Sequence, residues 1–306
     1  MSARLRGIIG APEIAVLPGA YDGFSARLIE RAGFEAAFIT GSGISESRLG
    51  QPDVGVAGLA EQVGAARDLA ACVGLPLIAD ADTGYGNAVN VFYTTQSFEQ
   101  AGVAGMMIED QTWPKRCGHL AGKELISAAE MAGKVSAAAQ ARRDEEFVIM
   151  ARTDAAASLG VEGAVERANL YAEAGADLLF ADALLSAEDI ARFAAEVNGP
   201  VAVNMGFAIR RRATTPLMSP AELQELGVAV MIAPRMLTAS AALGMQRALE
   251  ALSESMRTGE VVDRPELLIS FEELHELMGF DGIQALERQF LAEEGLALKY
   301  GRAGSG

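Results

Sequence analysis

The 306-residue sequence predicts an α/β protein, a closed (β/α)8 TIM barrel followed by further C-terminal helices. Three observations lead to this prediction. Short apolar segments alternate with helical segments along the chain, and these apolar segments are apolar almost throughout, as is typical of parallel strands covered on both faces. Glycine follows directly after several helical segments, where it favours the left-handed conformation that ends a helix. Eight strand–helix units in about 250 residues match the usual size of such a barrel.

The expected strands are short and consist almost entirely of apolar residues. In chain order they are Ile14–Pro18, Ala36–Thr40, Pro76–Asp80, Gly105–Ile108, Phe147–Ala151, Asp177–Ala181, Val201–Asn204 and Val228–Ala233.

The expected helices lie between these strands and after the last one. They are Gly23–Ala32, Leu59–Val73, Val89–Ala101, Ser127–Arg143, Glu162–Ala174, Ala187–Val197, Pro220–Leu226 and Ser240–Arg257. Three of them end in Ala-Gly, at Gly33, Gly102 and Gly175, and the next strand begins within a few residues.

Two amphipathic helices, Phe271–Met278 and Asp281–Glu294, are expected beyond the eighth unit. We therefore predict a barrel catalytic domain over residues 1–257 and a C-terminal helical extension and tail over 258–306. A doubly wound open sheet would use the same strand–helix units. It would normally carry a phosphate-binding fingerprint after its first strand, and Leu17-Pro18-Gly19-Ala20-Tyr21-Asp22 is not such a fingerprint.

The charge of the chain restricts its partners. Its formal net charge is −16, which argues against nucleic acid and against anionic membrane surfaces as ligands. Cys72 and Cys117 lie far apart in sequence and indicate a reducing compartment. No secretory apolar segment is evident in Met1–Ala11, and no apolar run reaches the ~20 residues that span a bilayer, so we expect a cytoplasmic protein.

Acidic side chains stand where the active site of a barrel is expected, at the C-terminal ends of the strands. Asp80 and Asp82 end the third strand, and Glu109 ends the fourth. Hard oxygen ligands of this kind suit Mg2+, or Mn2+, rather than zinc. Each carboxylate alone could equally cap a helix or pair with Arg152, but three at one end of a barrel favour a metal site.

A cysteine between cationic residues lies in the loop after the fourth strand, in Lys115-Arg116-Cys117-Gly118-His119. Nearby positive charge favours the thiolate, and such a group can exchange a proton with a carbanion. The alternative is an inert loop cysteine in a solvated basic patch. The position of the loop, next to the acidic cluster, favours the catalytic interpretation.

Four segments resemble the motifs of the isocitrate lyase/phosphoenolpyruvate mutase superfamily, in the same order and spacing along nearly the whole chain. The resemblance is greatest to the 2-methylisocitrate lyases and the carboxyphosphonoenolpyruvate phosphonomutases. The segments are Asp80-Ala81-Asp82-Thr83-Gly84-Tyr85-Gly86, Ile108-Glu109-Asp110-Gln111, Lys115-Arg116-Cys117-Gly118-His119 and Ile149-Met150-Ala151-Arg152-Thr153-Asp154.

The resemblance implies roles for individual residues. Asp80 would be the principal Mg2+ ligand, with Asp82 and Glu109 acting directly or through water. Arg152 would hold a 2-oxo acid, and Cys117 would be the catalytic acid. Lys115 and His119 would assist this chemistry. The remaining residues expected to contact or border the substrate are Thr40, Gly41, Ser42, Asp53, Gly118, His119, Asp182 and Asn204.

The sequence departs from the superfamily pattern at several positions. Asp182 stands where the lyases usually have glutamate, and its side chain is one methylene shorter. Phe38 replaces a tyrosine and cannot transfer a proton, which leaves the general base open. The residues shortly after Asn204 also differ from the pattern. They are Gly206-Phe207, and the unusual run Arg210-Arg211-Arg212 comes a few residues later. Arg210 is therefore a candidate for reading a distal carboxylate or phosphonate, with a solvated surface loop as the equal alternative.

The resemblance implies a Mg2+-dependent lyase that cleaves the C2–C3 bond of a 2-hydroxy di- or tricarboxylate. The products would be a 2-oxo acid, pyruvate or glyoxylate, and a carboxylate. Three alternatives remain: a phosphonomutase, an oxaloacetate decarboxylase or hydrolase, and a non-catalytic barrel that binds small acids. In this superfamily the C-terminal helices pack on a neighbouring subunit, so the resemblance also implies a homotetramer.

Overall fold

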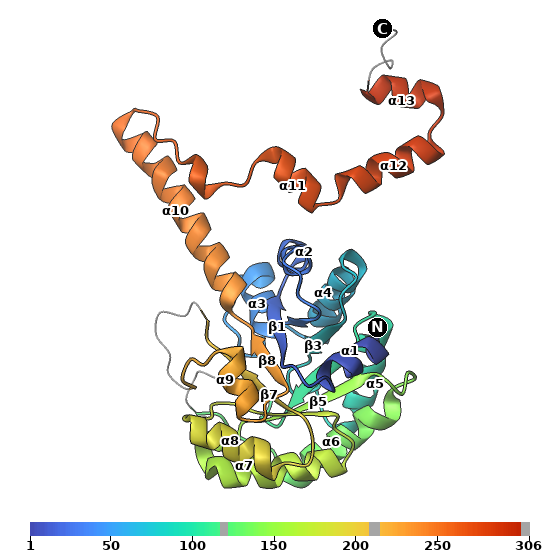
Figure 1. Ribbon diagram of the computed structural model, residues 1–306, viewed down its shortest axis with the longest axis vertical. Helices are drawn as coiled ribbons and strands as arrows, with labels where there is room; N and C mark the ends of the chain where they lie inside the picture. Colours follow the sequence, from blue (N-terminus) through green and yellow to red (C-terminus); the bar gives the residue numbers. More distant parts are fainter. Residues whose placement is uncertain (117–121, 208–214, 301–306) are drawn as a thin grey trace. The chain divides into compact units, whose positions relative to one another are not determined.

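The computed structural model describes residues 1–116, 122–207 and 215–300, and in it eight parallel strands close into a barrel (Figure 1). Each strand pairs with the next in sequence, and the first pairs with the eighth. The predicted TIM barrel is thereby confirmed. The strands are β1 Ala15–Ala20, β2 Ala37–Ile39, β3 Leu77–Asp80, β4 Gly105–Glu109, β5 Val148–Thr153, β6 Leu178–Ala181, β7 Val201–Asn204 and β8 Val230–Ala233.

Helices follow the strands and surround the barrel (Figure 1). Those within the described barrel are α1 Ser2–Ile9, α2 Gly23–Arg31, α3 Gly41–Ile44, α4 Leu59–Cys72, α5 Ala88–Gln100, α6 Ala128–Ala141, α7 Ala156–Glu173, α8 Ala187–Glu196 and α9 Pro220–Glu225. A short π-helical segment, Ser45–Leu49, follows α3. The C-terminal helices are α10 Met236–Thr258, α11 Phe271–Leu277, α12 Phe280–Phe290 and α13 Glu293–Tyr300, and a 3-10 turn covers Pro265–Leu267.

The chain divides into two compact units, Met1–Ala242 and Leu243–Gly306. The division falls inside α10, whereas the sequence analysis put the domain boundary at the end of that helix, after residue 257. The extent of the catalytic domain stays a prediction. Across the described residues, no helix is both long and apolar enough to cross a membrane.

Side-chain caps set the start of several barrel helices. Ser127, Ser186 and Ser219 each accept a hydrogen bond from the backbone N–H three residues later, which satisfies a donor that the first helical turn leaves open. Helix α7 begins six residues before the predicted start, because a separate turn precedes Gly160, whose φ of 71° interrupts the helix.

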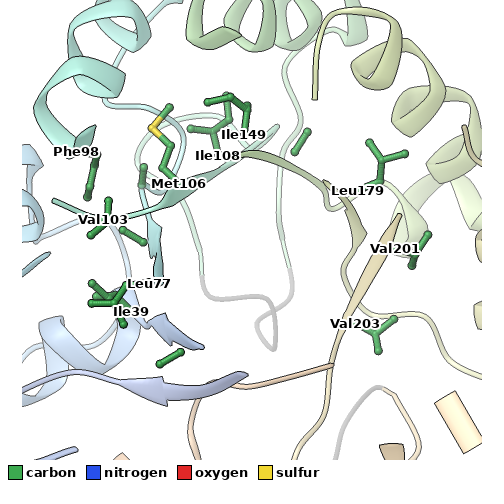
Figure 2. Close-up of a cluster of buried hydrophobic side chains, with 14 of the residues drawn as sticks. Ile39, Leu77, Phe98, Val103, Met106, Ile108, Ile149, Leu179, Val201 and Val203 are labelled. Atoms are coloured by element: carbon green, nitrogen blue, oxygen red, sulfur yellow. The ribbon is translucent and has the colours of Figure 1, made fainter. Parts of the chain in front are cut away.

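Most of the buried apolar side chains lie between the strands and the surrounding helices. Figure 2 shows part of this layer, where Met106 and Ile108 of β4 lie near Ile149 of β5. Met107, between them in sequence, points the other way and belongs to a second cluster inside the barrel. Two buried faces on every strand explain why the strand sequences show no polar alternation.

Helix α1, which the sequence analysis did not predict, packs with the interior cluster. Its Leu5 and Ile9 are buried against residues such as Val148 at the start of β5. Arg6 donates a hydrogen bond of 2.8 Å to Asp177, just before β6. The amino-terminal end of the barrel is therefore covered, and the opposite end, which carries the polar strand ends, is left for a site.

Candidate active site

A pocket opens at the C-terminal ends of the strands and gathers side chains from most of the barrel. It contains nine of the predicted site residues. The lining residues are Phe38, Thr40, Ser42, Asp53, Asp80, Met107, Glu109, Lys115, Arg152, Phe180, Asp182, Asn204, Pro234 and Arg235.

The floor of the pocket is apolar. Phe38 of β2, Met107 of β4 and Phe180 of β6 line it, and all three belong to the interior cluster of the barrel. Alternate strands of a (β/α)8 barrel contribute side chains to one interior layer. The floor is thus the uppermost such layer, and it holds the polar groups above it away from the barrel core.

Asp80 is the last residue of β3, and the turn that follows has an unusual backbone. Asp82 has a φ of 48° and Tyr85 a φ of 59°, in the left-handed region that side chains other than glycine seldom occupy. The Asp80 carboxylate accepts hydrogen bonds from the N–H groups of Gly41 at 3.3 Å and of Asp82 at 3.0 Å. Backbone donors from two strand ends therefore fix the orientation of Asp80.

Lys115 crosses this end of the barrel to reach two carboxylates. Its Nζ lies 2.5 Å from Asp53 Oδ1 and 2.9 Å from Asp82 Oδ1, and the lysine is only 4% exposed. Burial raises the pKa of Asp82 to about 7, although Lys115 acts in the opposite direction. The pKa of Lys115 is raised well above its ordinary value, because the surrounding carboxylates outweigh its burial. Lys115 is therefore a permanent cation beside Asp82.

Glu109 is a buried carboxyl group with a partner, among the described residues, at only one of its two oxygens. Its Oε2 lies 3.3 Å from Arg152, so part of the ion-pair alternative raised for these carboxylates is realised. Its Oε1 accepts no hydrogen bond within the described structure. Burial raises the pKa of Glu109 well above its ordinary value, with Arg152 opposing. An open carboxylate oxygen that is costly to ionise is suited to a cation or to water bound to one.

The carboxylates of the site therefore fit Mg2+, provided that water completes the coordination of the ion. Nowhere in the described residues do three or more His, Cys, Asp or Glu side chains form a group that could hold a metal by themselves. Mg2+ usually keeps several waters and takes one or two protein carboxylates. Asp80 with Asp82 and Glu109 matches that arrangement, and their assignment as ligands stays a prediction.

Arg152, near the end of β5, is the centre of a second group of charged side chains in the site. Its Nε and Nη2 donate to the two oxygens of Asp154, each at 2.9 Å, and its Nη2 lies 3.1 Å from Asp182. The guanidinium also lies over the Phe180 ring, 5.3 Å from its centroid. Burial alone raises the pKa of Asp154, but Arg152 and then Lys123 outweigh it and lower the pKa below its ordinary value.

Asp110, next to Glu109, holds the end of β5 from behind the pocket. It is fully buried and accepts hydrogen bonds from Thr153 Oγ1 at 2.7 Å and from the Asp154 N–H at 2.9 Å. Tyr171 and Arg167 of α7 donate to the same carboxylate, at 2.8 and 2.9 Å. Helix α7 is thus tied to the strand that carries Arg152.

The pocket brings together most of the residues that the sequence analysis selected, and Gly41 and Asp82 lie directly against Asp80. Cys117, Gly118, His119 and Arg210-Arg211-Arg212 lie outside the described residues. The sequence analysis missed Lys123, which lies 2.6 Å from Asp154, because a lysine after a loop has no distinguishing pattern. It also missed Phe180, although the alternation of interior positions along β6 could have found it.

Comparisons with known proteins agree with this geometry. The family model described as phosphoenolpyruvate phosphomutase matches residues 5–253. A 2,3-dimethylmalate lyase of Eubacterium barkeri is 40% identical over 289 residues, which cover 94% of this chain and 98% of that protein. A 2-methylisocitrate lyase of Aeropyrum pernix is 41% identical over 276 residues, covering 90% and 86% of the two chains.

Solved structures are similar over almost the whole chain. An oxaloacetate acetylhydrolase in complex with the inhibitor 3,3-difluorooxalacetate gives a TM-score of 0.86 at 34% identity, covering 94% of this chain and 96% of that one. A phosphonopyruvate hydrolase in complex with oxalate and Mg2+ gives 0.82 at 30% identity, covering 95% and 99%. The fold agrees with these matches, and the chain belongs to the phosphoenolpyruvate mutase/isocitrate lyase superfamily and is an enzyme of its lyase and mutase type.

Proposed function

We propose that this protein is a Mg2+-dependent lyase that cleaves the C2–C3 bond of a 2-hydroxy di- or tricarboxylate to a 2-oxo acid and a carboxylate. The observation that carries the proposal is the pocket itself, whose lining brings Arg152 together with the carboxylates of Asp80 and Glu109. The small-carboxylate substrates in the names of the two lyase relatives support it.

Mg2+ would be held by Asp80, with Asp82 and Glu109 acting directly or through water. When bound, it would act as a Lewis acid on the oxygens of the 2-hydroxy acid. The complex of phosphonopyruvate hydrolase with oxalate and Mg2+ supports this choice of metal, since oxalate resembles a 2-oxo acid. Mn2+ has the same preference for oxygen ligands and is a possible substitute.

Arg152 and the start of α3 would hold the carboxylate of the retained 2-oxo acid. Arg152 offers planar N–H donors suited to a carboxylate. Thr40 ends β2, and its hydroxyl lies 3.0 Å from the hydroxyl of Ser42. The segment Thr40, Gly41 and Ser42, with its two hydroxyl groups, would then lie against the same anion.

Cleavage leaves an electron pair on the α-carbon of the departing carboxylate, and that carbon must receive a proton. We assign this role to Cys117, assisted by Lys115, Gly118 and His119 of the same sequence motif, on the strength of that motif. Asn204 and Arg210 would contact the departing half. Phe38 has no proton acceptor, so the base that takes the hydroxyl proton is a different group.

The second candidate is an oxaloacetate hydrolase. It is favoured by one specific observation, the match to oxaloacetate acetylhydrolase over 94% of the chain. A phosphonomutase would use the same oxo-acid half of the site. A decarboxylase is the remaining alternative. The non-catalytic acid-binding barrel is excluded by the match to lyase and mutase relatives, with which the intact set of Asp80, Glu109 and Arg152 agrees.

A substrate panel tests the proposal. Purified protein with Mg2+ is incubated with 2,3-dimethylmalate, 2-methylisocitrate, oxaloacetate and phosphonopyruvate, and pyruvate, glyoxylate and oxalate are measured. Release of a 2-oxo acid from a 2-hydroxy acid supports the lyase, and oxalate from oxaloacetate would support the hydrolase instead.

A Cys117→Ser variant should lose kcat by ~10²–10⁴-fold with oxalate binding retained. An unchanged kcat would remove Cys117 from the mechanism.

We also propose a homotetramer in which the C-terminal helices of one subunit pack on a neighbour. Apolar side chains recur at helical spacing on α10 and on α12, in the unit Leu243–Gly306. Those exposed there include Met245, Leu249, Leu252 and Met256 on α10, and Ile283, Leu286 and Phe290 on α12. Exposed apolar stripes of this length call for a partner surface.

A further inference from the structure

Lys123 joins the charges around Arg152 from a part of the chain to which no role has been assigned. Its Nζ lies 2.6 Å from Asp154 Oδ1 and 3.2 Å from Asp182 Oδ2. Only 7% of its side chain is exposed. A lysine buried this deeply is held in one place by its charge partners, which are both carboxylates at the ends of neighbouring strands.

The same two carboxylates are the partners of Arg152. Arg152 Nη2 lies 2.9 Å from Asp154 Oδ1 and 3.1 Å from Asp182 Oδ2. The four side chains therefore form a closed ring of two cations and two anions. Their charges cancel, and each carboxylate is shared between a guanidinium and an ammonium group.

This sharing determines how much of Arg152 is left for a substrate. Without Lys123, Asp154 and Asp182 would both rely on Arg152, which already lies 3.3 Å from Glu109. The two carboxylates of the ring would then share one guanidinium, and an incoming carboxylate would meet one more negative charge than it does with Lys123 in place. With Lys123 in place, the ring is neutral and Arg152 can offer donors to an anion.

The ring also gives a use to the shorter side chain at residue 182. Asp182 stands where glutamate was expected, and its shorter side chain places Oδ2 in contact with Lys123 and Arg152. Burial lowers the pKa of Lys123, but Asp154 and Asp182 outweigh burial and raise it, so Lys123 stays a cation at neutral pH.

We propose that Lys123 and Asp182 act together as positioning residues, which balance the charge around Arg152 and so set its orientation and availability for the carboxylate of a 2-oxo acid. This inference rests on the proposed function, because it assumes that Arg152 binds an oxo acid. Neither residue needs to touch the reacting atoms for this role.

The experiment measures oxalate binding by calorimetry in the presence of Mg2+, for the parent and four variants. Lys123→Gln leaves the ring with one cation and two carboxylates and should weaken oxalate binding by ~tenfold, a size typical of groups that share one network. Lys123→Arg keeps the charge and should weaken it less. The double variant Lys123→Gln/Asp182→Asn restores neutrality and should recover most of the lost affinity. Arg192→Gln, which removes an exposed ion pair with Glu196, should bind like the parent.

Recovery in the double variant is the decisive result, because a merely structural role would leave the double variant no better than Lys123→Gln alone. A double variant that binds oxalate no more tightly than Lys123→Gln, or a folded Lys123→Gln variant that binds oxalate like the parent, would overturn the inference. If Lys123→Gln does not fold, a folded double variant that binds oxalate supports the charge-balance role, and an unfolded one contradicts it. A parent protein that binds no oxalate with Mg2+ would instead count against the proposed function.

Discussion

At the scale of single residues, Gly41 shows how closely the site is built. A β-carbon added there would lie 2.8 Å from Asp80 Oδ2, too close for an ordinary contact. Gly41→Ala should therefore displace the Asp80 carboxylate and lower Mg2+-dependent turnover by roughly 10²-fold, the cost typical of a misplacement near 1 Å. Steady-state kinetics over a range of Mg2+ concentrations measure this loss.

Gly64→Ala is the matched control for that change. A β-carbon at Gly64, in the middle of α4, would meet no atom within 4 Å. Alanine also favours a helix over glycine by ~1 kcal/mol, so this variant should keep full activity and gain slight stability. Equal activity of the two variants would show that the contact between Gly41 and Asp80 is unimportant.

The raised pKa of Asp82 predicts how Mg2+ binding depends on pH. In the folded, metal-free protein, burial raises the pKa of Asp82 to about 7, although Lys115 acts to lower it. Below that value Mg2+ must displace a proton, so its apparent affinity should rise with pH and level off above about 7. Burial also raises the pKa of Glu109, so this residue should contribute to the same pH dependence.

The raised pKa of Asp82 also determines how the stability of the metal-free protein depends on pH. A carboxyl group whose pKa is higher in the folded than in the unfolded state favours folding at low pH, and this contribution is lost as pH rises through the folded value. Metal-free protein should lose stability between about pH 4 and pH 7, and Mg2+ should raise Tm more at pH 8 than at pH 5. An equal rise in Tm at both pH values would contradict the assignment of Asp82 to the metal site.

Residues that belong to motifs could be predicted from sequence, and residues that act through tertiary contacts could not. Asp80, Glu109 and Arg152 end strands, so their meeting in one pocket followed from the barrel. Lys123 reaches Asp154 across 31 residues, and nothing in the local sequence indicates that contact. The ion pairs of Asp182 with Lys123 and Arg152 likewise join residues that are far apart in sequence.

At the scale of elements, Asp110 links β4, β5 and α7. It receives hydrogen bonds from both neighbouring strand-end residues, Thr153 and Asp154, and from Arg167 and Tyr171 of α7. Asp110→Asn removes the negative partner of Arg167 and leaves buried donors poorly satisfied. The free energy of unfolding should fall by about 2–4 kcal/mol. Chemical denaturation measures this change.

Glu196→Gln serves as the comparison for Asp110→Asn. It removes one partner of the exposed pair Arg192–Glu196 on α8, which should contribute little to stability because solvent screens the pair. A loss of stability in Asp110→Asn no larger than in Glu196→Gln would mean that the buried link between α7 and β5 adds nothing.

Elements with strong local patterns were predicted within a few residues, and short or tertiary-dependent ones were missed. The eight strands and the barrel helices were predicted because apolar runs and glycine stops are local signals. Helix α1 was missed because it is stabilised by contacts far along the chain, such as Arg6 with Asp177. Helix α3 is only four residues long, and its Thr40 cap lies at the end of a strand.

At the scale of the whole molecule, the exposed apolar stripe on α10 predicts assembly. A homotetramer would cover Met245, Leu249, Leu252 and Met256, which as a group are 59–80% exposed in the single chain. Static light scattering should give about four times the 32.0 kDa chain mass. Replacing Leu249 and Leu252 with glutamate should shift that mass towards smaller species. A well-behaved monomer of the parent protein would contradict the proposal that the C-terminal helices pack on a neighbouring subunit.

The central claim is that the pocket cleaves a C2–C3 bond with the help of Mg2+. The most direct measurement is proton NMR of the reaction with the best 2-hydroxy acid of the panel, with and without a chelator. We predict that a 2-oxo acid and a carboxylate appear in equal amounts, and that chelation or Asp80→Asn stops their formation. Turnover that persists in full after chelation, or consumption of the substrate without release of a 2-oxo acid, would contradict the account.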